Sequence, residues 1–312
     1  MKKLVITSTA IAAIIFIQAT TINSPIDKES LGRILFSDPI LSKDSTVSCA
    51  SCHRPEHAFA DTSAVSLGVE RKKGLRNTPT AMNLLLANSF FWDGRAKTLE
   101  EQALAPIANP NEMNLPVEEA VYRLQHNKKY VAYFKEAFNS EASKTNLSAA
   151  IAAFERTLET GESPFDNWKF SDDSTAVSAE VKRGFALFNG KGNCVKCHFG
   201  SDFTANEFRN IGFFNVKNLN DSGRSIVSGK ADDIGKFKTS SLRNIAITSP
   251  YMHNGMFKTL DEVIDFYNDT RKIVPNAINK DSLLVKPLGL TLQDKKDLKA
   301  FLISLTDKRF KQ

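Results

Sequence analysis

All four cysteines of this 312-residue chain fall in two copies of one short pattern, Cys-x-x-Cys-His. The first copy reads CASCH and ends at His53, and the second reads CVKCH and ends at His198. Two thiols spaced in this way can bond to the two vinyl groups along one porphyrin edge, and the histidine that follows then reaches the iron. The sequence therefore predicts two covalently bound c-type haems, with His53 and His198 as iron ligands. The attaching cysteines are Cys49, Cys52, Cys194 and Cys197.

Other uses of the four cysteines fit the pattern less well. In an exported protein, four cysteines first suggest disulfide bonds, but the two patterns consume all of them. A zinc ion can take two Cys-x-x-Cys pairs, yet it has no need of a histidine directly after each pair. A thioredoxin-like redox pair would not normally occur twice in one chain. We therefore interpret the pattern as haem attachment.

The N-terminus has the features of a secretory signal. Lys2 and Lys3 precede an apolar run from Leu4 to Ile17, and small and polar residues follow it. The run is shorter than the roughly 20 residues that a membrane-spanning helix needs. We expect residues 1–23 to be a signal peptide and the protein to be exported to the periplasm. An uncleaved anchor is the alternative, and it would also place the rest of the chain outside the cytoplasm.

The composition indicates a globular protein that is long enough for two domains. Hydrophobic residues make up 42% of the chain and charged residues 24%, which is typical of folded proteins. No long basic run with interleaved aromatic residues is present, so a nucleic-acid partner is not expected. The densest basic cluster, Glu70 to Arg76, is predicted to be mostly a solvated loop.

The chain also carries one succession of motifs twice. Gly-x-x-Leu-Phe precedes each haem motif, Leu-Arg-Asn follows it, and a longer segment containing Lys-Thr-Leu comes last. Apolar residues recur at helical spacing, as from Leu147 to Leu158, and no sustained strand alternation occurs. We predict an all-α fold of two tandem cytochrome c-like haem domains with long loops. A polar stretch from Glu162 to Glu180 separates the halves, so the domains are predicted at residues 24–165 and 166–312.

The longer repeated segment predicts a helix in each half, and both helices begin in the same way. Thr98 with Glu101, and Thr259 with Glu262, have the Thr-x-x-Glu spacing of a capping box. We therefore expect matching helix starts.

The two copies differ at a position with chemical meaning. The residue 14 places after Trp92 is Pro106, whereas the residue 14 places after His253 is Tyr267. A tyrosine oxygen can bind haem iron, but proline has no donor atom and is expected to interrupt the helix. We expect the second haem to be capped and the first to be open. A buried core tyrosine is the alternative for Tyr267.

Two polar residues flank Pro106, and both are candidates for catalysis. Gln102 lies one helical turn before it, and Glu112 follows it in the segment NEMN. A carboxylate over an open haem can move a proton between the two oxygens of peroxide. The alternatives are a glutamine on a helix surface and a carboxylate on a loop.

At this point the chain resembles a known family, the bacterial dihaem cytochrome c peroxidases and their MauG relatives. The resemblance spans nearly the whole mature chain and is carried by the segments CASCH, RNTPTAMN, FFWDGRAKTLEEQALAPI, NEMN, CVKCH and SPYMHNGMFKTLDEV. It implies that His53 binds the iron of the peroxidatic haem and His198 that of the electron-transfer haem. It also implies that Trp92 lies between the two haems.

The resemblance assigns the remaining site residues. Glu112 matches the distal acid/base, with Gln102 beside it. An interdomain calcium ion is implied at Asn77 and the backbone carbonyls of Thr248 and Pro250, and oxygen ligands suit such a hard cation.

The sequence departs from the common peroxidase pattern at two positions. Many of these peroxidases place a histidine where this chain has Val69, and valine cannot bind iron. Many also have a methionine where this chain has Tyr267, and tyrosine there is the MauG-type residue. Met252 and Met256 remain alternative ligands of the second haem. The other histidines are His57, expected to pack or face solvent, and His126, expected on a helix surface.

The implied function is reduction of hydrogen peroxide with electrons from a small redox protein, a cytochrome c or a cupredoxin. The first alternative is MauG-like oxidation of aromatic residues on a partner protein, which Val69 and Tyr267 favour. The second is a dihaem electron carrier without catalysis, which Glu112 and an open first haem disfavour.

Overall fold

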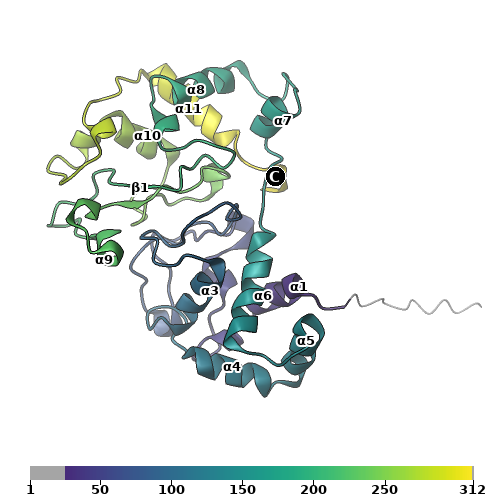
Figure 1. The fold of residues 1–312 in the computed structure, drawn as a ribbon. Coiled ribbons are helices and arrows are strands. Elements are labelled where there is room, and N and C mark those ends of the chain that lie inside the picture. Colours follow the sequence, from purple (N-terminus) through teal and green to yellow (C-terminus); the bar gives the residue numbers. More distant parts are fainter. Residues whose placement is uncertain (1–24, 311–312) are drawn as a thin grey trace, which may run out of the picture.

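The structure is a computed structural model that describes residues 25–310, so the predicted signal peptide lies outside the described residues. This part of the chain is mainly helical, which confirms the predicted helical character (Figure 1). Two short strands, β1 (Phe208–Arg209) and β2 (Phe237–Lys238), pair antiparallel. No helix in this range is long and apolar enough to cross a membrane.

The helices fall into two groups along the chain. Those of the first half are α1 (Lys28–Ser37), α2 (Cys49–Cys52), α3 (Leu99–Ala108), α4 (Val117–Gln125), α5 (Lys128–Phe138) and α6 (Lys144–Arg156). Those of the second half are α7 (Pro164–Phe170), α8 (Ala179–Asn189), α9 (Ser225–Ser228), α10 (Leu260–Asn268) and α11 (Leu292–Ile303). Long loops with short 3-10 turns connect them.

Each half has its own hydrophobic core, and Figure 1 shows the halves as two lobes joined after α6. Buried residues of the larger first-half core run from Leu31 to Leu158, and those of the second-half core run from Phe165 to Leu305. The predicted boundary between residues 165 and 166 falls within α7, whose Phe165 already packs in the second core.

The same helix crossing builds both cores. Gly32 on α1 lies against the backbone of Ala150 on α6, and Gly184 on α8 lies in the same way against Asp297 on α11. A Cβ atom at either glycine would overlap the facing carbonyl group. The Gly-x-x-Leu-Phe motif therefore has glycine where two helices touch, because only the missing side chain permits this approach.

The longer repeated segment folds identically in both halves before its helix. Phe90 pairs with Ala96, and Tyr251 pairs with Phe257, in matching antiparallel bridges. The glycine within each turn has a left-handed backbone, with φ of 68° at Gly94 and 62° at Gly255. The duplication seen in the sequence is therefore a duplication of backbone conformation.

The two helix starts are not fully equivalent, which corrects one sequence prediction. Thr259 and Glu262 form a complete capping box. Thr98 accepts from the Glu101 backbone N–H, but the Glu101 carboxylate accepts from Lys97 N, at 2.7 Å, and not from Thr98. The first helix start therefore has half of the predicted box.

Pro106 does not interrupt its helix, which corrects a second prediction. Helix α3 continues past Pro106 to Ala108. The proline stands in the last turn, where its missing N–H leaves only the carbonyl of Gln102 without a helical partner. The Pro106 carbonyl in turn accepts from Met113 N at 3.1 Å, so the helix end is tied to the following turn.

Candidate active site

The two haem motifs have matching histidines with one ring nitrogen engaged. His53 Nδ1 lies 2.9 Å from the carbonyl oxygen of Phe59, and His198 Nδ1 lies 2.9 Å from that of Phe203. Donation to a carbonyl fixes the proton on Nδ1 and leaves Nε2 as a lone pair suited to iron. Burial lowers the pKa of both histidines, which favours the neutral imidazole that a metal requires.

The four cysteines are unpaired thiols in the structure. Burial raises the pKa of Cys194 to about 12, and it also raises that of Cys49 well above its usual range. Within residues 25–310, no three histidine, cysteine or acidic side chains are grouped so that they could hold a metal ion, as a shared zinc site would require. The residues present therefore fit two separate haems, each held by its own Cys-x-x-Cys-His motif.

Glu112 lies in the same half as the first haem motif, within electrostatic range of it. Its carboxylate is close enough for its charge to influence the pKa of both Cys49 and Cys52. Asn109 Nδ2 donates to Glu112 Oε1 at 2.7 Å. Burial raises the pKa of the Glu112 carboxyl, while Arg95 and the Asn109 hydrogen bond act in the opposite direction. A partly desolvated carboxyl of this kind keeps a proton more readily than an exposed one, which suits an acid/base role.

Gln102 and Val69 come from two other segments of the first half. Gln102 is partly buried on α3, one turn before Pro106, and within residues 25–310 its side chain has no hydrogen-bond partner. Val69 is 1% exposed, and its backbone N–H donates to the Glu112 carbonyl at 2.8 Å. Val69 therefore packs directly on the turn that carries Glu112.

Tyr267 lies beside the second haem motif, near the end of α10. It is near enough to Cys197 and Cys194 for either thiol to affect its pKa, and burial raises that pKa well above the usual range. Its side chain is partly buried and packs against the second-half core. A tyrosine oxygen at this place is chemically able to bind the iron of the second haem.

The alternative ligands and the other histidines lie in different surroundings. Met252 packs against the second core, whereas Met256 is 37% exposed and contacts Asn254. His57 is partly buried, and His126 is exposed and stacks on Tyr122. Of the two methionines, only Met252 is placed against the interior.

Trp92 joins the two halves through the backbone of Asn77. Its indole N–H donates to the Asn77 carbonyl at 2.8 Å, and Asn77 N donates to the His253 carbonyl at 2.7 Å. On the other side, Lys238 N of strand β2 donates to the Trp92 carbonyl at 2.8 Å. The tryptophan is therefore held by both halves.

The predicted calcium ligands still have free oxygen atoms. The Asn77 side-chain nitrogen lies 3.2 Å from Ser63 O and 3.3 Å from Ala64 O, and it donates to both. Among the described residues, nothing donates to Asn77 Oδ1 or to the carbonyls of Thr248 and Pro250. These neutral oxygens are suited to a hard cation.

Sequence reasoning missed the ion pairs made by the arginines of the two Leu-Arg-Asn motifs. Arg76 binds Asp221 of the other half through two nitrogens, at 2.7 and 2.8 Å, and also binds Asp93 at 2.6 Å. Arg243 binds Asp166 through two nitrogens, and it also binds Asp202. Arg76 is thus an exception to the prediction of a solvated basic cluster. The repetition of Leu-Arg-Asn in the two halves was the sequence feature that could have indicated these ion pairs.

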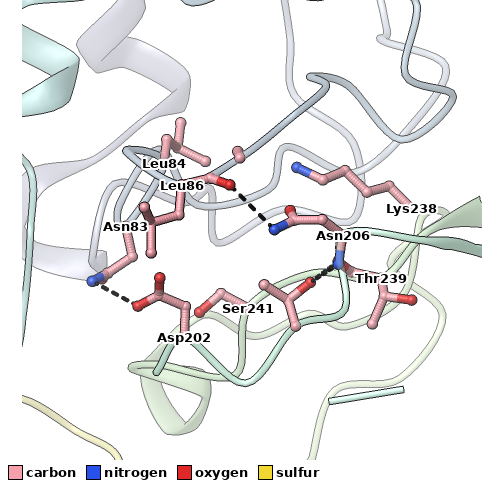
Figure 2. Close-up of a pocket in the computed structure, with 10 residues that line it drawn as sticks. Asn83, Leu84, Leu86, Asp202, Asn206, Lys238, Thr239 and Ser241 are labelled. Carbon is pink, nitrogen blue, oxygen red and sulfur yellow. Dashed lines mark hydrogen bonds between the residues drawn. The ribbon is translucent and has the colours of Figure 1, made fainter. Parts of the chain in front are cut away.

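A small pocket lies at the seam between the halves (Figure 2). Asn83 Nδ2 lies 3.4 Å from Asp202 across it, and Asn206 Nδ2 lies 3.4 Å from the Leu86 carbonyl. Its volume of about 30 Å³ is room for ordered water and not for an organic substrate. None of the predicted site residues lines it, so it is a feature of the interface and not of the candidate active site.

Comparison with known proteins identifies the family of the chain. A family model described as di-haem cytochrome c peroxidase matches residues 26–174. The chain is 40% identical over 283 residues to the methylamine utilization protein MauG of Methylorubrum extorquens, covering 89% of this chain and 78% of that protein. It is 37% identical over 311 residues to the cytochrome-c peroxidase IdrP1 of Denitromonas iodatirespirans, covering 90% and 81%.

A solved structure shows the same fold. The crystal structure of a MauG-like protein associated with microbial copper homeostasis matches with a TM-score of 0.83 and 33% identity, covering 96% of this chain and 99% of that one. The chain therefore belongs to the dihaem cytochrome c peroxidase family, whose members carry two covalently bound c-type haems.

Proposed function

We propose that this protein is an exported, periplasmic peroxidase that reduces hydrogen peroxide to water with electrons from a small donor protein, a cytochrome c or a cupredoxin. The observation that carries the proposal is the position of Glu112. Its carboxylate lies within electrostatic range of the first Cys-x-x-Cys pair, accepts a hydrogen bond from Asn109 and has a pKa raised by burial. An electron carrier needs no such acid/base group.

The haem held by Cys49, Cys52 and His53 would supply the iron chemistry that breaks the peroxide O–O bond. Glu112 would take a proton from one peroxide oxygen and deliver it to the other, which makes that oxygen a better leaving group. Gln102 would orient the peroxide through its amide. The overall change consumes two electrons and two protons and releases two water molecules, so the donor must supply both electrons.

The second half would store and deliver those electrons. In this proposal residues 24–165 form the peroxidatic domain and residues 166–312 the electron-transfer domain. His198 and Tyr267 would both bind the second iron, and Trp92 would lie on the path between the haems. A calcium ion at Asn77, Thr248 and Pro250 would hold the domains together.

A second candidate function is supported by two residues. Val69 leaves no histidine to cap the first iron, and Tyr267 supplies an oxygen ligand that stabilises higher oxidation states better than methionine does. These features favour MauG-like oxidation of an aromatic side chain on a partner protein. In that case the partner protein, and not a small donor protein, would supply the two electrons and two protons that peroxide reduction consumes.

Steady-state turnover of hydrogen peroxide with a small reduced cytochrome c tests the first proposal. We expect turnover by the wild-type holoenzyme and a loss of roughly 10²-fold in Glu112→Gln, as for removal of a positioned acid/base group. Glu118→Gln, a change at an exposed carboxylate on α4, is the matched control and should be neutral. Two low-spin haems in the oxidised spectrum, with no turnover, would instead indicate an electron carrier.

A further inference from the structure

A tight loop in the first half presses against the turn that carries Glu112. Residues 66–74 fold back on themselves, with Leu67 paired to Lys73 in an antiparallel bridge. Gly68 N donates to Lys72 O at 2.8 Å, and Gly74 N donates to Ser66 O at 2.9 Å. The backbone at the tip of this loop is therefore internally fixed.

The loop meets the Glu112 turn backbone to backbone. Val69 N donates to Glu112 O at 2.8 Å. A Cβ atom on Gly68 would lie 2.6 Å from Glu112 Cα and would overlap the carbonyl oxygens of Asn111 and Glu112. Real Cβ atoms do not approach backbone atoms this closely, so any side chain at Gly68 would force the two segments apart.

Backbone conformation does not explain the glycine. Gly68 has φ of −85°, a value open to every residue. The close approach to Glu112 is therefore the reason that this position lacks a side chain. Gly74, in the same loop, is different, because a Cβ there would lie 3.4 Å from Ser66 O, which is an ordinary contact.

The turn that carries Glu112 is also held by Lys43 and by hydrogen bonds within the turn itself. Lys43 N donates to Met113 O at 2.9 Å, while Lys43 Nζ forms an ion pair at 2.9 Å with Glu70 of the same loop. Within the turn, Glu112 N donates to Asn109 O at 3.0 Å, and Asn109 Nδ2 donates to the carboxylate. With its backbone fixed on two sides, the Glu112 side chain has little freedom to change its position.

We propose that Gly68 is a positioning residue that acts through Glu112, by allowing the Val69 loop to seat against the Glu112 backbone and set where the carboxylate stands. The inference rests on the proposed acid/base role of Glu112. A shift of about 1 Å at such a group can reduce the rate by on the order of 10²-fold. Gly68 itself touches neither haem nor substrate in this account.

The test is a comparison of Gly68→Ala with Gly74→Ala in the holoenzyme. We expect Gly68→Ala to lower kcat/KM for hydrogen peroxide by roughly 10- to 100-fold and to move the pH dependence of that rate, because the burial of the carboxyl changes. Gly74→Ala should behave as the wild type. Haem absorbance should stay unchanged in both variants.

A double-mutant cycle then separates positioning from general damage. In the Glu112→Gln background, Gly68→Ala should cause little further loss. An equal loss in both backgrounds, or wild-type kinetics for Gly68→Ala, would overturn the positioning role. Near-normal turnover in Glu112→Gln alone would instead overturn the proposed acid/base role, so the two failures are distinguishable.

Val69→Ala covers the case in which Gly68→Ala does not fold. It removes part of a buried side chain of the first-half core, so the loop should seat less firmly on the Glu112 turn although no atom is inserted. It should lower the rate in the wild-type background and not in Glu112→Gln. A loss of the same size in both backgrounds would contradict the proposal.

Discussion

Trp92 and His253 occupy the same position in the two copies of the repeated segment, and in the folded protein they meet. Their rings lie edge to face, with centroids 6.4 Å apart and planes inclined by 71°. His253 is 4% exposed and stacks on Phe237 of strand β2 at 3.6 Å. The duplicated segments therefore bring their own equivalent residues together at the interface between the halves.

The buried His253 predicts a loss of stability in acid. Burial lowers its pKa from 6.5 to about 4, with Asp221 acting to raise it and Arg76 to lower it. The unfolded chain binds the proton first, so this contribution is complete above about pH 6.5 and is lost as the pH falls towards 4. His253→Phe, which keeps an aromatic ring against Phe237, should lose less stability between pH 7 and pH 4. The measurement is the thermal unfolding midpoint across that range.

The control for this prediction is His126→Phe, because His126 is an exposed histidine. It should show the pH dependence of the wild type. The same acid loss in His253→Phe as in the wild type would mean that another group causes it.

Haem attachment should be separable between the two motifs. Cys194→Ala should weaken covalent attachment at the second site and leave the first site fully loaded, because the motifs lie in separate cores. Mass spectrometry after acid-acetone extraction should show two haems on the wild-type protein and a mixture of one and two on the variant. Cys49→Ala should affect the other haem. Loss of both haems from either single variant would contradict independent sites.

The oxidised enzyme should react with peroxide without prior reduction. Val69 packs on the Glu112 turn and has no atom that can block the first iron. In the ferric protein, the second haem should be low-spin, and Tyr267→Phe should make it high-spin in absorbance and EPR spectra. A methionine–iron charge-transfer band that survives in Tyr267→Phe would assign the ligand to Met252 instead. A need for one-electron pre-reduction would contradict the open first haem.

Removal of calcium should loosen the contact between the halves. Chelation is expected to lower both peroxide turnover and the unfolding midpoint, and added Ca²⁺ should restore them, whereas Mg²⁺ should do so poorly because it demands a smaller octahedral site. Asn77→Ala should reproduce the chelated state, since it removes a free side-chain oxygen. Elemental analysis that finds no calcium, with activity indifferent to chelation, would remove the ion from the proposal.

Glu155 predicts a decline of stability towards alkaline pH. Its side chain is buried on α6, Oε2 has no partner within residues 25–310, and burial raises its pKa from 4.5 to about 8. The folded state holds this proton more tightly, so the contribution is complete below about pH 4.5 and is lost as the pH rises through 8. Glu155→Gln should reduce the pH dependence of the thermal unfolding midpoint between pH 5 and pH 9. Glu141→Gln, a change at an exposed carboxylate, is the control and should keep the pH dependence of the wild type. If the midpoint of Glu155→Gln falls with pH as steeply as that of the wild type, Glu155 is not the group responsible.

Several features could be predicted from the sequence because they depend on residues close together in the chain. The Cys-x-x-Cys-His motifs and the cap at Thr259 each depend on residues within a few positions of one another. The helical character follows from the same local spacing. Glu112 was identified as a candidate by its short distance in sequence from Pro106, and its acid/base role stays a prediction.

Tertiary structure decided what depends on segments far apart in sequence. Gly68 shows nothing unusual in its own backbone, and only the docked Glu112 turn explains why it has no side chain. Arg76 reads as part of a solvated basic run until Asp221 of the other half lies against it. The full cap predicted at Thr98 is only half formed: Glu101 accepts from Lys97 N alone, whereas Glu262 accepts from both Lys258 N and Thr259 N. Local patterns select the helices and the cofactor, whereas burial and close approach between distant segments set the positions and pKa values on which the chemistry depends.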